Sequence, residues 1–440
     1  MAELTSDVAD TICRTVELGV TITGAAVDAD DRTHIFCEVL DPDRRCPDCE
    51  VPGQRRDLVE RVLTDTPAAG HPVLLHVAVP RFVCHTTDCS RSIFRARIDH
   101  IARPRAVVTT RTERWILQRI VIDKMSVAAV AANLAISWRT VNQIAIAAAR
   151  TLVYDGDHLD GVRCLGVDEH KWKHVRGQGD PSFVTVLIDL TPVIDGTGPA
   201  RLLDMIGGRS KQVLKEWMGD RDQQFRDRIK IVAMDGFTGY KSATAEELPK
   251  ARVVMDPFHV VRLAGDALDR CRRRVQLAIH GHRGFRDDPL YKSRRTLHTG
   301  ADLLTDKQSD RLRALFVDDA HVEVEATWGV YQRMIAAYRH EDRQRGRELM
   351  EKLITDLSAG VPKVLTELTT LGRTLKKRAA DVLAYFERPG TSNGPTEALN
   401  GRLEHLRGSA LGFRNLTNYI ARSLLETGGF RPQLLHPRLG

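Results

Sequence analysis

Three aspartates follow short, largely apolar segments that are typical of buried β-strands. They are Asp168 after residues 164–167, Asp235 after residues 229–234 and Asp256 after residues 252–255. Where such strands are neighbours in a sheet, their carboxylates come together, and the negative charges repel one another unless cations lie between them. Mg²⁺ and Mn²⁺ prefer these hard oxygen ligands, and two such ions can activate an attacking hydroxyl and stabilise the leaving oxygen in phosphoryl transfer. Each aspartate alone has an ordinary structural explanation, so the evidence lies in their joint arrangement.

Four of the eight cysteines form two close pairs, Cys46 with Cys49 and Cys84 with Cys89. Two pairs of thiolates, each presented by one turn, suit a tetrahedral zinc ion, and nearby arginines favour the ionised thiols. The alternative is buried free cysteine, which is the better interpretation of the remaining four. His85 could replace one ligand, although Cys89 has the better spacing. We therefore predict one structural Zn²⁺ with no open coordination position, which would support folding and DNA contact rather than catalysis.

Residues 125–144 have the pattern of two short helices joined by a tight turn. Ser126 and Ser137 are the expected N-caps. Apolar residues at helical spacing would form a shared inner face, namely Val127, Val130, Leu134, Val141 and Ile144. The second helix would then turn polar side chains outward, as a recognition helix does toward base edges, and these are Trp138, Arg139, Thr140, Asn142 and Gln143. The alternative is an ordinary pair of packed helices, but the capped turn and the polar second helix favour a helix-turn-helix DNA-binding domain.

The composition is that of a folded protein with several domains. The chain has 440 residues, which is more than one domain core usually organises. Of these residues, 42% are hydrophobic. The net charge of +7 is modest, but basic residues gather at 95–119 and 262–295, where they would attract a polyanion or form solvated helix faces. No signal peptide or membrane-spanning run is evident, and the sparse cysteines argue against a disulfide scaffold. We therefore expect a cytoplasmic, nucleoid-associated protein with no membrane partner.

The elements that must position these residues change character along the chain. β-rich segments come first, and the hydrophobic period becomes helical from 105 to 150. Residues 160–261 have the pattern of three strands, a helix, a strand, a helix and a strand, which is compatible with a ribonuclease H-like core. Residues 262–390 are charged and helical. A Gly-Pro turn and a long helix follow, with Glu397 in the first turn of that helix, where an acid also suits the helix dipole.

Several of these segments resemble the ISL3 family of prokaryotic insertion-sequence transposases, which are DDE-type enzymes. The resemblance extends from the cysteine pairs to the last helix, and its most specific pieces are 166–169, 235–240, 256–260, 392–400 and 412–415. It implies that Asp168, Asp235 and Glu397 are catalytic acids that hold two Mg²⁺ or Mn²⁺ ions. It also implies that Asp256 and His259 form an accessory Asp-x-x-His signature.

Together, the patterns and the resemblance predict a multi-domain α/β plus α protein. Its parts would be a β-rich module with the four-cysteine zinc site at 1–100, a helix-turn-helix at 101–152, the first part of a ribonuclease H-like catalytic core at 160–261, an all-helical insertion at 262–390 and the completion of the core by the Glu397 helix at 391–440. The protein would bind double-stranded transposon ends and catalyse metal-dependent strand cleavage and strand transfer into target DNA. Because two ends must be joined, at least a dimer is expected in the active complex.

Basic residues beside the acids could hold DNA phosphates, or could be exposed charges near a cleft. They are Lys171, Lys173, His174, Arg402 and Arg407. Glu404 stands where family members usually carry a basic residue, which would weaken a phosphate contact. Trp172 could stack on an unpaired base, although a partly buried core position is the simpler interpretation.

Two other functions are compatible with the sequence. One is a non-catalytic DNA-binding regulator that keeps the zinc and helix-turn-helix modules, although retention of all three acids argues against it. The other is a ribonuclease H-like nuclease of repair or defence, which terminal inverted repeats beside the gene would disfavour. A tyrosine recombinase would need an exposed nucleophile. Tyr419 is the only candidate, and its apolar helical neighbours indicate packing instead.

Overall fold

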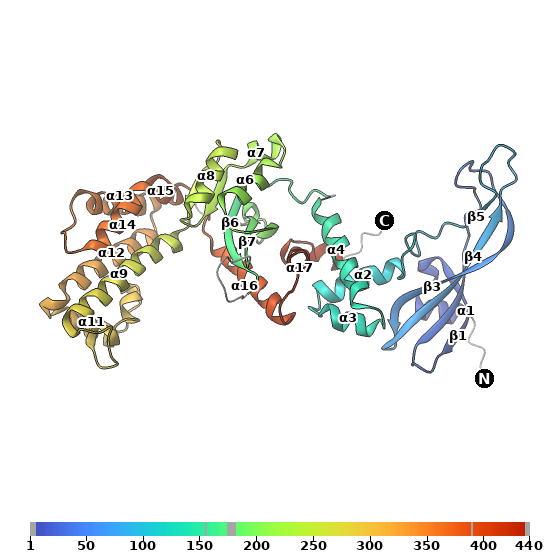
Figure 1. Ribbon diagram of the computed structural model, residues 1–440, viewed down its shortest axis with the longest axis horizontal. Helices are drawn as coiled ribbons and strands as arrows, with labels where there is room; N and C mark the ends of the chain where they lie inside the picture. The colour runs from blue at the N-terminus through green and yellow to red at the C-terminus, as the bar shows by residue number, and fades with distance from the viewer. Residues whose placement is uncertain (1–5, 155, 174–181, 389, 436–440) are drawn as a thin grey trace. The chain divides into compact units, whose positions relative to one another are not determined.

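The computed structural model describes residues 6–154, 156–173, 182–388 and 390–435 (Figure 1). The chain divides into two compact units. The first unit comprises residues 1–156 and 409–440, and the second comprises residues 157–408. Within the described ranges, no helix is both long enough and apolar enough to cross a bilayer.

A five-stranded sheet occupies the N-terminal part of the first unit. Its strands are β1 (Val20–Val27), β2 (Thr33–Val39), β3 (Gln54–Ala68), β4 (His71–Val83) and β5 (Ile93–Arg95), in the order β1-β2-β4-β3 with β5 paired to β4. The helix α1 (Ser6–Cys13) and the 3₁₀ turn η1 (Val16–Leu18) precede the sheet. Alternate residues of β4 from Val73 to Val79 are buried, as expected for a strand with one face on a core. The sequence predicted β-structure here but not the long β3–β4 hairpin.

Helices form the rest of the first unit. They are α2 (Thr110–Val121), α3 (Val127–Asn133), α4 (Trp138–Tyr154), α17 (Leu416–Thr427) and α18 (Arg431–Leu435). Ala421 and Leu425 of α17 share one apolar core with α2, α3 and α4. The predicted last domain, 391–440, is therefore divided, because residues from 409 onward belong with the first unit. The periodicity of α17 shows that one face is buried but not which partner buries it.

A second five-stranded sheet, of mixed direction, organises the second unit. Its strands are β6 (Cys164–Lys171), β7 (Phe183–Asp189), β8 (Arg201–Gly207), β9 (Ile231–Met234) and β10 (Arg252–Met255), in the order β10-β9-β6-β7-β8. β7 is antiparallel to β6 and β8, whereas β9 is parallel to β6 and β10. The connecting helices are α5 (Thr191–Ile194), α6 (Lys211–Gly219), α7 (Gln223–Arg228) and α8 (Thr238–Glu247). The predicted alternation of strands and helices is thus present.

The two faces of this sheet are covered by different helices. Leu165 and Val167 of β6 join a core with residues of α6, α7 and α8. Because side chains alternate along a strand, Gly166 and Asp168 face the opposite side, where α16 (Gly394–Ser409) packs. A Cβ atom on Gly166 would lie 3.1 Å from Thr396 Oγ1 of α16, so the absence of a side chain there lets the helix approach the strand closely.

Between β10 and α16, every element that the structure describes is helical, as predicted for residues 262–390. The α-helices are α9 (Pro257–His280), α10 (Pro289–Lys292), α11 (Asp306–Phe316), α12 (Val322–Arg339), α13 (Arg343–Ala359), α14 (Thr366–Lys377) and α15 (Ala379–Glu387), with 3₁₀ turns η2 (Thr296–His298), η3 (Ala301–Leu303) and η4 (Asp319–His321). They enclose a core of their own, which Met255 at the end of β10 joins. This helical region is therefore anchored to the sheet at the strand end next to the acids.

Candidate functional site

Asp168 and Asp235 lie side by side at one edge of the second sheet. Val167 of β6 pairs with Met234 of β9 in a parallel register, so the next residue along each strand is an aspartate. Neighbouring strands are about 4.8 Å apart. The sheet order therefore brings together two predicted acids that are far apart in the sequence.

The Asp168 carboxylate is held by two N–H donors. Its Oδ1 accepts a hydrogen bond from the backbone N–H of Glu169 at 2.8 Å, and its Oδ2 accepts one from Asn400 Nδ2 on α16, also at 2.8 Å. Burial raises the pKa of Asp168 to about 7, the Glu169 N–H lowers it, and the negative charges of Asp235, Glu169 and Glu397 raise it. A nearby cation would stabilise the ionised form of a carboxyl group in this environment. Its positive charge would offset both the cost of burying the negative charge and the repulsion from the other acids.

Glu397 approaches the same edge on α16. Its N–H donates to Asn393 O at 2.8 Å, which places it in the first turn of the helix, and its side chain is exposed. Asn400, which bonds Asp168, follows three residues later, about 4.5 Å along the helix axis. Although the residue is exposed overall, neighbouring atoms exclude part of the water around its carboxyl group and raise the pKa of Glu397, as does the charge of Asp256, while Arg262 lowers it. Glu397 therefore lies on the helix that contacts Asp168, and its charge acts on that acid.

The acids do not form a closed ligand cluster. In the part of the chain that the structure describes, only the four paired cysteines form a group of three or more candidate ligands whose atoms all lie within 4.8 Å of one another. Asp235 Oδ1 accepts a hydrogen bond from the Phe237 N–H at 2.8 Å, which fixes one side of that carboxylate. The three acids therefore lie in the same part of the second unit without forming a compact group of ligands.

Asp256 connects this edge to the start of α16. It is only 3% exposed. Its Oδ2 caps α9 by accepting from the His259 N–H at 3.0 Å, and its Oδ1 accepts from the Asn393 N–H at 2.6 Å. The His259 ring lies against Gly236, beside Asp235. Because both Asp256 oxygens bind backbone donors, its geometry favours a structural role, in which it determines where the Glu397 helix begins.

The basic residues predicted near the acids differ in their surroundings. Lys173 and Arg402 are exposed, and Lys171 Nζ lies 5.4 Å from the centre of the Phe183 ring. Arg407 donates to Glu404 at 3.0 Å, so part of its charge is neutralised on its own helix. Trp172 is buried and offers no open face for stacking. His174 lies outside the described residues.

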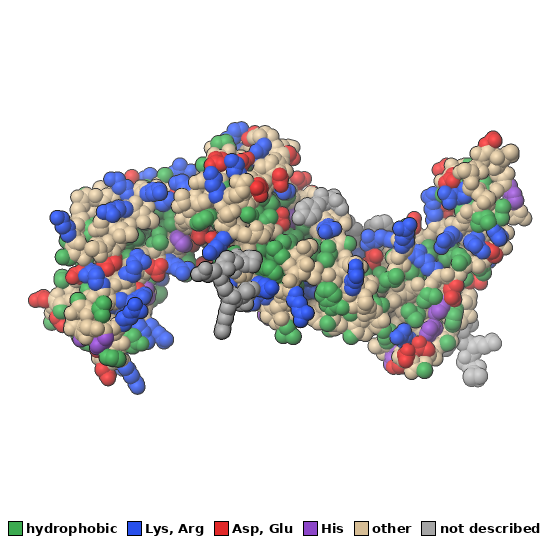
Figure 2. All heavy atoms as spheres, viewed as in Figure 1, with side chains coloured by type: hydrophobic (Ala, Val, Ile, Leu, Met, Phe, Trp, Pro, Cys, Tyr) green, Lys and Arg blue, Asp and Glu red, His purple; other side chains and the backbone are tan. Residues whose placement is uncertain are grey.

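The basic cluster at 262–295 is partly neutralised. Arg272 and Arg273 pair with Asp269, and Arg274 bonds both Glu323 and Glu367. On the visible face of this helical region, Lys and Arg side chains are scattered, with acidic side chains among them (Figure 2). Solvated and ion-paired helix faces therefore account for much of this cluster.

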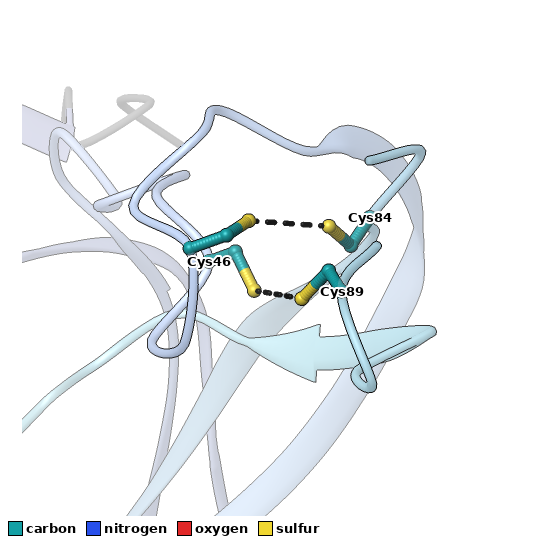
Figure 3. A group of neighbouring side chains, drawn as sticks. Cys46, Cys84 and Cys89 are labelled. Atoms are coloured by element: carbon teal, nitrogen blue, oxygen red, sulfur yellow. Dashed lines mark hydrogen bonds between the residues drawn. The ribbon is translucent and has the colours of Figure 1, made fainter. Parts of the chain in front are cut away.

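The four paired cysteines converge in the first unit (Figure 3). Cys46 Sγ lies 3.8 Å from Cys89 Sγ, and Cys49 Sγ lies 3.6 Å from Cys84 Sγ. A tetrahedral ion with Zn–S bonds of about 2.3 Å requires sulfurs about 3.8 Å apart. These distances fit zinc, and they pair each cysteine of the first turn with one of the second.

The cysteine cluster has a polar neighbour in Thr86. Its hydroxyl lies 3.5 Å from Cys49 Sγ. Hydrogen bonding to Thr86 and to the Val51 N–H lowers the pKa of Cys49 to about 6, and an ionised thiol is the form that binds metal. Four cysteines would fill all four positions of a tetrahedral site, so a metal ion held there would have no open position for catalysis.

Helices α3 and α4 form the predicted helix-turn-helix. Ser126 Oγ accepts from the Ala129 N–H and Ser137 Oγ accepts from the Thr140 N–H, each at 3.1 Å, which confirms both predicted caps. Of the predicted inner face, Val127, Val130, Leu134 and Val141 are buried and Ile144 is partly buried. Ala135 has a φ of 51° in the connecting turn, a conformation that tightens the chain between the helices.

The outward face of α4 is smaller than predicted. Trp138 is 48% exposed, Arg139 and Gln143 are also exposed, and Thr140 is partly exposed. Asn142 was expected to face outward, and this is wrong. It is only 7% exposed and donates through Nδ2 to Asn418 Oδ1 at 3.2 Å, because α17 covers that side of α4.

The burial of Tyr419 decides between packing and a role as a nucleophile. Tyr419 is fully buried in α17, so it packs and is not an exposed nucleophile.

Asn400 contacts Asp168 but is absent from the predicted site residues. Its position three residues after Glu397 is the signal that could have identified it, because residues i and i+3 lie on one helix face.

Comparison with known proteins matches both parts of the chain. Residues 165–423 match a family model described as the transposase of the DDE ISL3 type, and residues 97–149 match the helix-turn-helix domain of transposase family ISL3. The transposase for insertion sequence element IS1557 of Mycobacterium tuberculosis is 26% identical over 320 residues, which is 68% of each chain. The transposase for insertion sequence element IS1001 of Bordetella parapertussis is 28% identical over 242 residues, covering 53% of this chain and 54% of the relative.

Proposed function

The chain belongs to the ISL3 family of DDE transposases, which cut and join DNA, and we propose that Asp168, Asp235 and Glu397 carry out its chemistry. The main support is geometric. Asp168 and Asp235 follow paired residues of neighbouring parallel strands. The helix that carries Glu397 contacts the Asp168 carboxylate directly.

The sheet of the second unit would be a ribonuclease H-like core with a helical insertion. In chain order, the strands lie third, second, first, fourth and fifth across the sheet, and only β7 runs against the others. This order supports the assignment. The region from α9 to α15 would be the insertion, because it separates β10 from α16 and has its own apolar core.

The acid site would hold divalent cations, the cofactor class that the DDE family uses. The residues fit this role, since Asp235, Glu169 and Glu397 place negative charge near Asp168, whose pKa is raised by burial, and hard oxygen ligands suit Mg²⁺ and Mn²⁺. When bound, two such ions would activate an attacking hydroxyl and stabilise the leaving oxygen. The chain itself orients the carboxylates, through the N–H groups that hold Asp168 and Asp235.

DNA would be recognised by the first unit and positioned by the second. Trp138, Arg139, Thr140 and Gln143 would contact bases or phosphates from the start of α4. Lys171, Lys173 and Arg402 would contact phosphates beside the acids, with Arg407 contributing less because of Glu404. Zn²⁺ at Cys46, Cys49, Cys84 and Cys89 would stabilise the N-terminal module. At least two copies of the chain would act together, because two transposon ends must meet.

The test uses the full-length chain and duplex DNA that carries both ends of its own element. With Mg²⁺, we expect new 3′-hydroxyl ends and then products joined to a target duplex, and no products with a chelator present. Cleavage without joining would favour the nuclease alternative. Stable binding with neither step would favour the regulator and overturn the proposal.

A further inference from the structure

Helix α16 and the residue just before it carry three polar side chains at helical spacing. Asn393 precedes the helix, and Thr396 and Asn400 follow at intervals of three and four residues, so they lie on one side. In each of them an oxygen atom, namely Asn393 Oδ1, Thr396 Oγ1 and Asn400 Oδ1, is buried without a hydrogen-bond partner. Buried oxygens are almost always satisfied in folded proteins, so each exception calls for a partner such as a bound water or an ion.

Asn400 differs from the other two because it touches an acid. Its Nδ2 donates to Asp168 Oδ2 at 2.8 Å. A carboxylate can only accept, so the amide NH₂ must face Asp168 and the amide oxygen remains unbonded beside it. By contrast, Thr396 Oγ1 lies against β6 at Gly166, and the Asn393 backbone is held by Asp256.

The unbonded oxygen of Asn400 is suited to a hard cation. Amide carbonyls are neutral oxygen ligands, which such ions accept together with carboxylates. Because Asp235 and Glu397 already place negative charge near Asp168, a further ligand without charge adds coordination and no further repulsion. The same side chain therefore offers a donor to one acid and an acceptor to whatever that acid binds.

We propose that Asn400 is a further ligand and positioning residue of the acid site: its Nδ2 holds the Asp168 carboxylate, and its Oδ1 binds the divalent cation that Asp168 binds. The inference rests on the proposed function, because it assumes that Asp168 is a metal ligand. It adds to the three acids a residue on the same helix as Glu397, three residues further along.

The test measures Mn²⁺ binding to the full-length chain by the paramagnetic resonance signal of free Mn²⁺. Asn400→Ala should weaken binding on the order of tenfold, the lower end of what loss of a supporting residue costs at metal sites. Thr396→Val is the matched control, since it removes a buried unbonded oxygen from the same face without touching an acid. It should bind Mn²⁺ as the wild type does.

A second variant separates positioning from simple packing. Asn400→Asp places a carboxylate where Asp168 now meets an N–H donor, so thermal unfolding without metal should occur at a lower temperature. Mn²⁺ should then raise the unfolding temperature of Asn400→Asp more than that of the wild type. A purely structural Asn400 would give the same metal-induced increase in both proteins, which would contradict the proposal.

Failure of the inference can be told from failure of the acid assignment. If Asp168→Asn loses Mn²⁺ binding while Asn400→Ala keeps wild-type affinity, the acids stand and the role of Asn400 is refuted. If Asp168→Asn binds Mn²⁺ as tightly as the wild type, the proposed acid site itself is wrong, and the inference with it.

Discussion

The cysteine cluster of the first unit and the acid site of the second are both sets of candidate metal ligands, but the chain assembles them in opposite ways. The cysteines come as two local pairs whose four sulfurs lie within 4.8 Å of one another. The acids come from β6, from the end of β9 and from α16, and Asp235 and Glu397 are 162 positions apart (397 minus 235). The first site is closed and local, whereas the second is open and depends on the whole sheet.

A bound metal would therefore have a different role at the cysteine cluster and at the acid site. The four cysteines belong to, or pack against, the apolar core of a β-module, so a metal bound there would add to the folding free energy that this core already supplies. Asp168 and Asp235 lie on a sheet with an extensive apolar core, next to a helical region that has a core of its own. Removing metal should therefore destabilise the fold around the cysteines and stop chemistry at the acids.

Replacing Cys49 with Ser should have the largest effect on stability. The variant keeps three of four ligands, and structural zinc sites contribute on the order of 10 kcal/mol to folding. We expect loss of the single zinc per chain, measured by atomic absorption, and early unfolding of the N-terminal module, measured by hydrogen exchange. Cys13→Ser is the control, since Cys13 lies outside the cluster. A Cys49→Ser chain that retains zinc and stability would show that the cluster is not a metal site.

Replacing Asp235 with Asn should have the converse effect. The change removes a charge but little volume, so the rate of strand joining should fall on the order of 10³-fold or more, about 4 kcal/mol of transition-state stabilisation. Binding to transposon ends, measured by gel shift, and the unfolding temperature should be preserved. The exposed Asp220 after α6 provides the control as Asp220→Asn. Undiminished joining by Asp235→Asn would refute the assignment.

The same contrast explains what the sequence could and could not predict. The cysteine pairs and the helix caps Ser126 and Ser137 depend on residues a few positions apart, and local patterns identify them. The strands were also predictable, but the adjacency of Asp168 and Asp235 required the sheet order. The burial of Asn142 under α17 could not be predicted, because it depends on a helix that returns to α4 from a distant part of the chain.

Gly166→Ala tests whether the acid site depends on the packing of α16. The added Cβ would lie 3.1 Å from both Thr396 Oγ1 and Leu190 Cδ1, so the helix must shift slightly. Overpacking of this kind costs about 1–3 kcal/mol, and a small misplacement of reacting groups can cost about 100-fold in rate. Gly401→Ala on the same helix is the control, because a Cβ there meets nothing within 4 Å. If the two variants cleave DNA equally well, the acid site does not depend on the close approach of α16 to β6.

The smallest effect is expected at the neighbour of the cysteine cluster, where Thr86→Val removes the hydroxyl that lies 3.5 Å from Cys49 Sγ. Loss of such a supporting contact should weaken zinc binding by about tenfold, which competition with a chromophoric chelator can measure. Thr87→Val, at an exposed neighbouring position, should leave zinc affinity unchanged. Since the cysteine site is closed and local, Thr86→Val should not alter the rate of strand cleavage once zinc is saturating. A slower rate of strand cleavage under those conditions would mean that the two sites are coupled. Zinc at the cysteine cluster would then affect catalysis as well as folding.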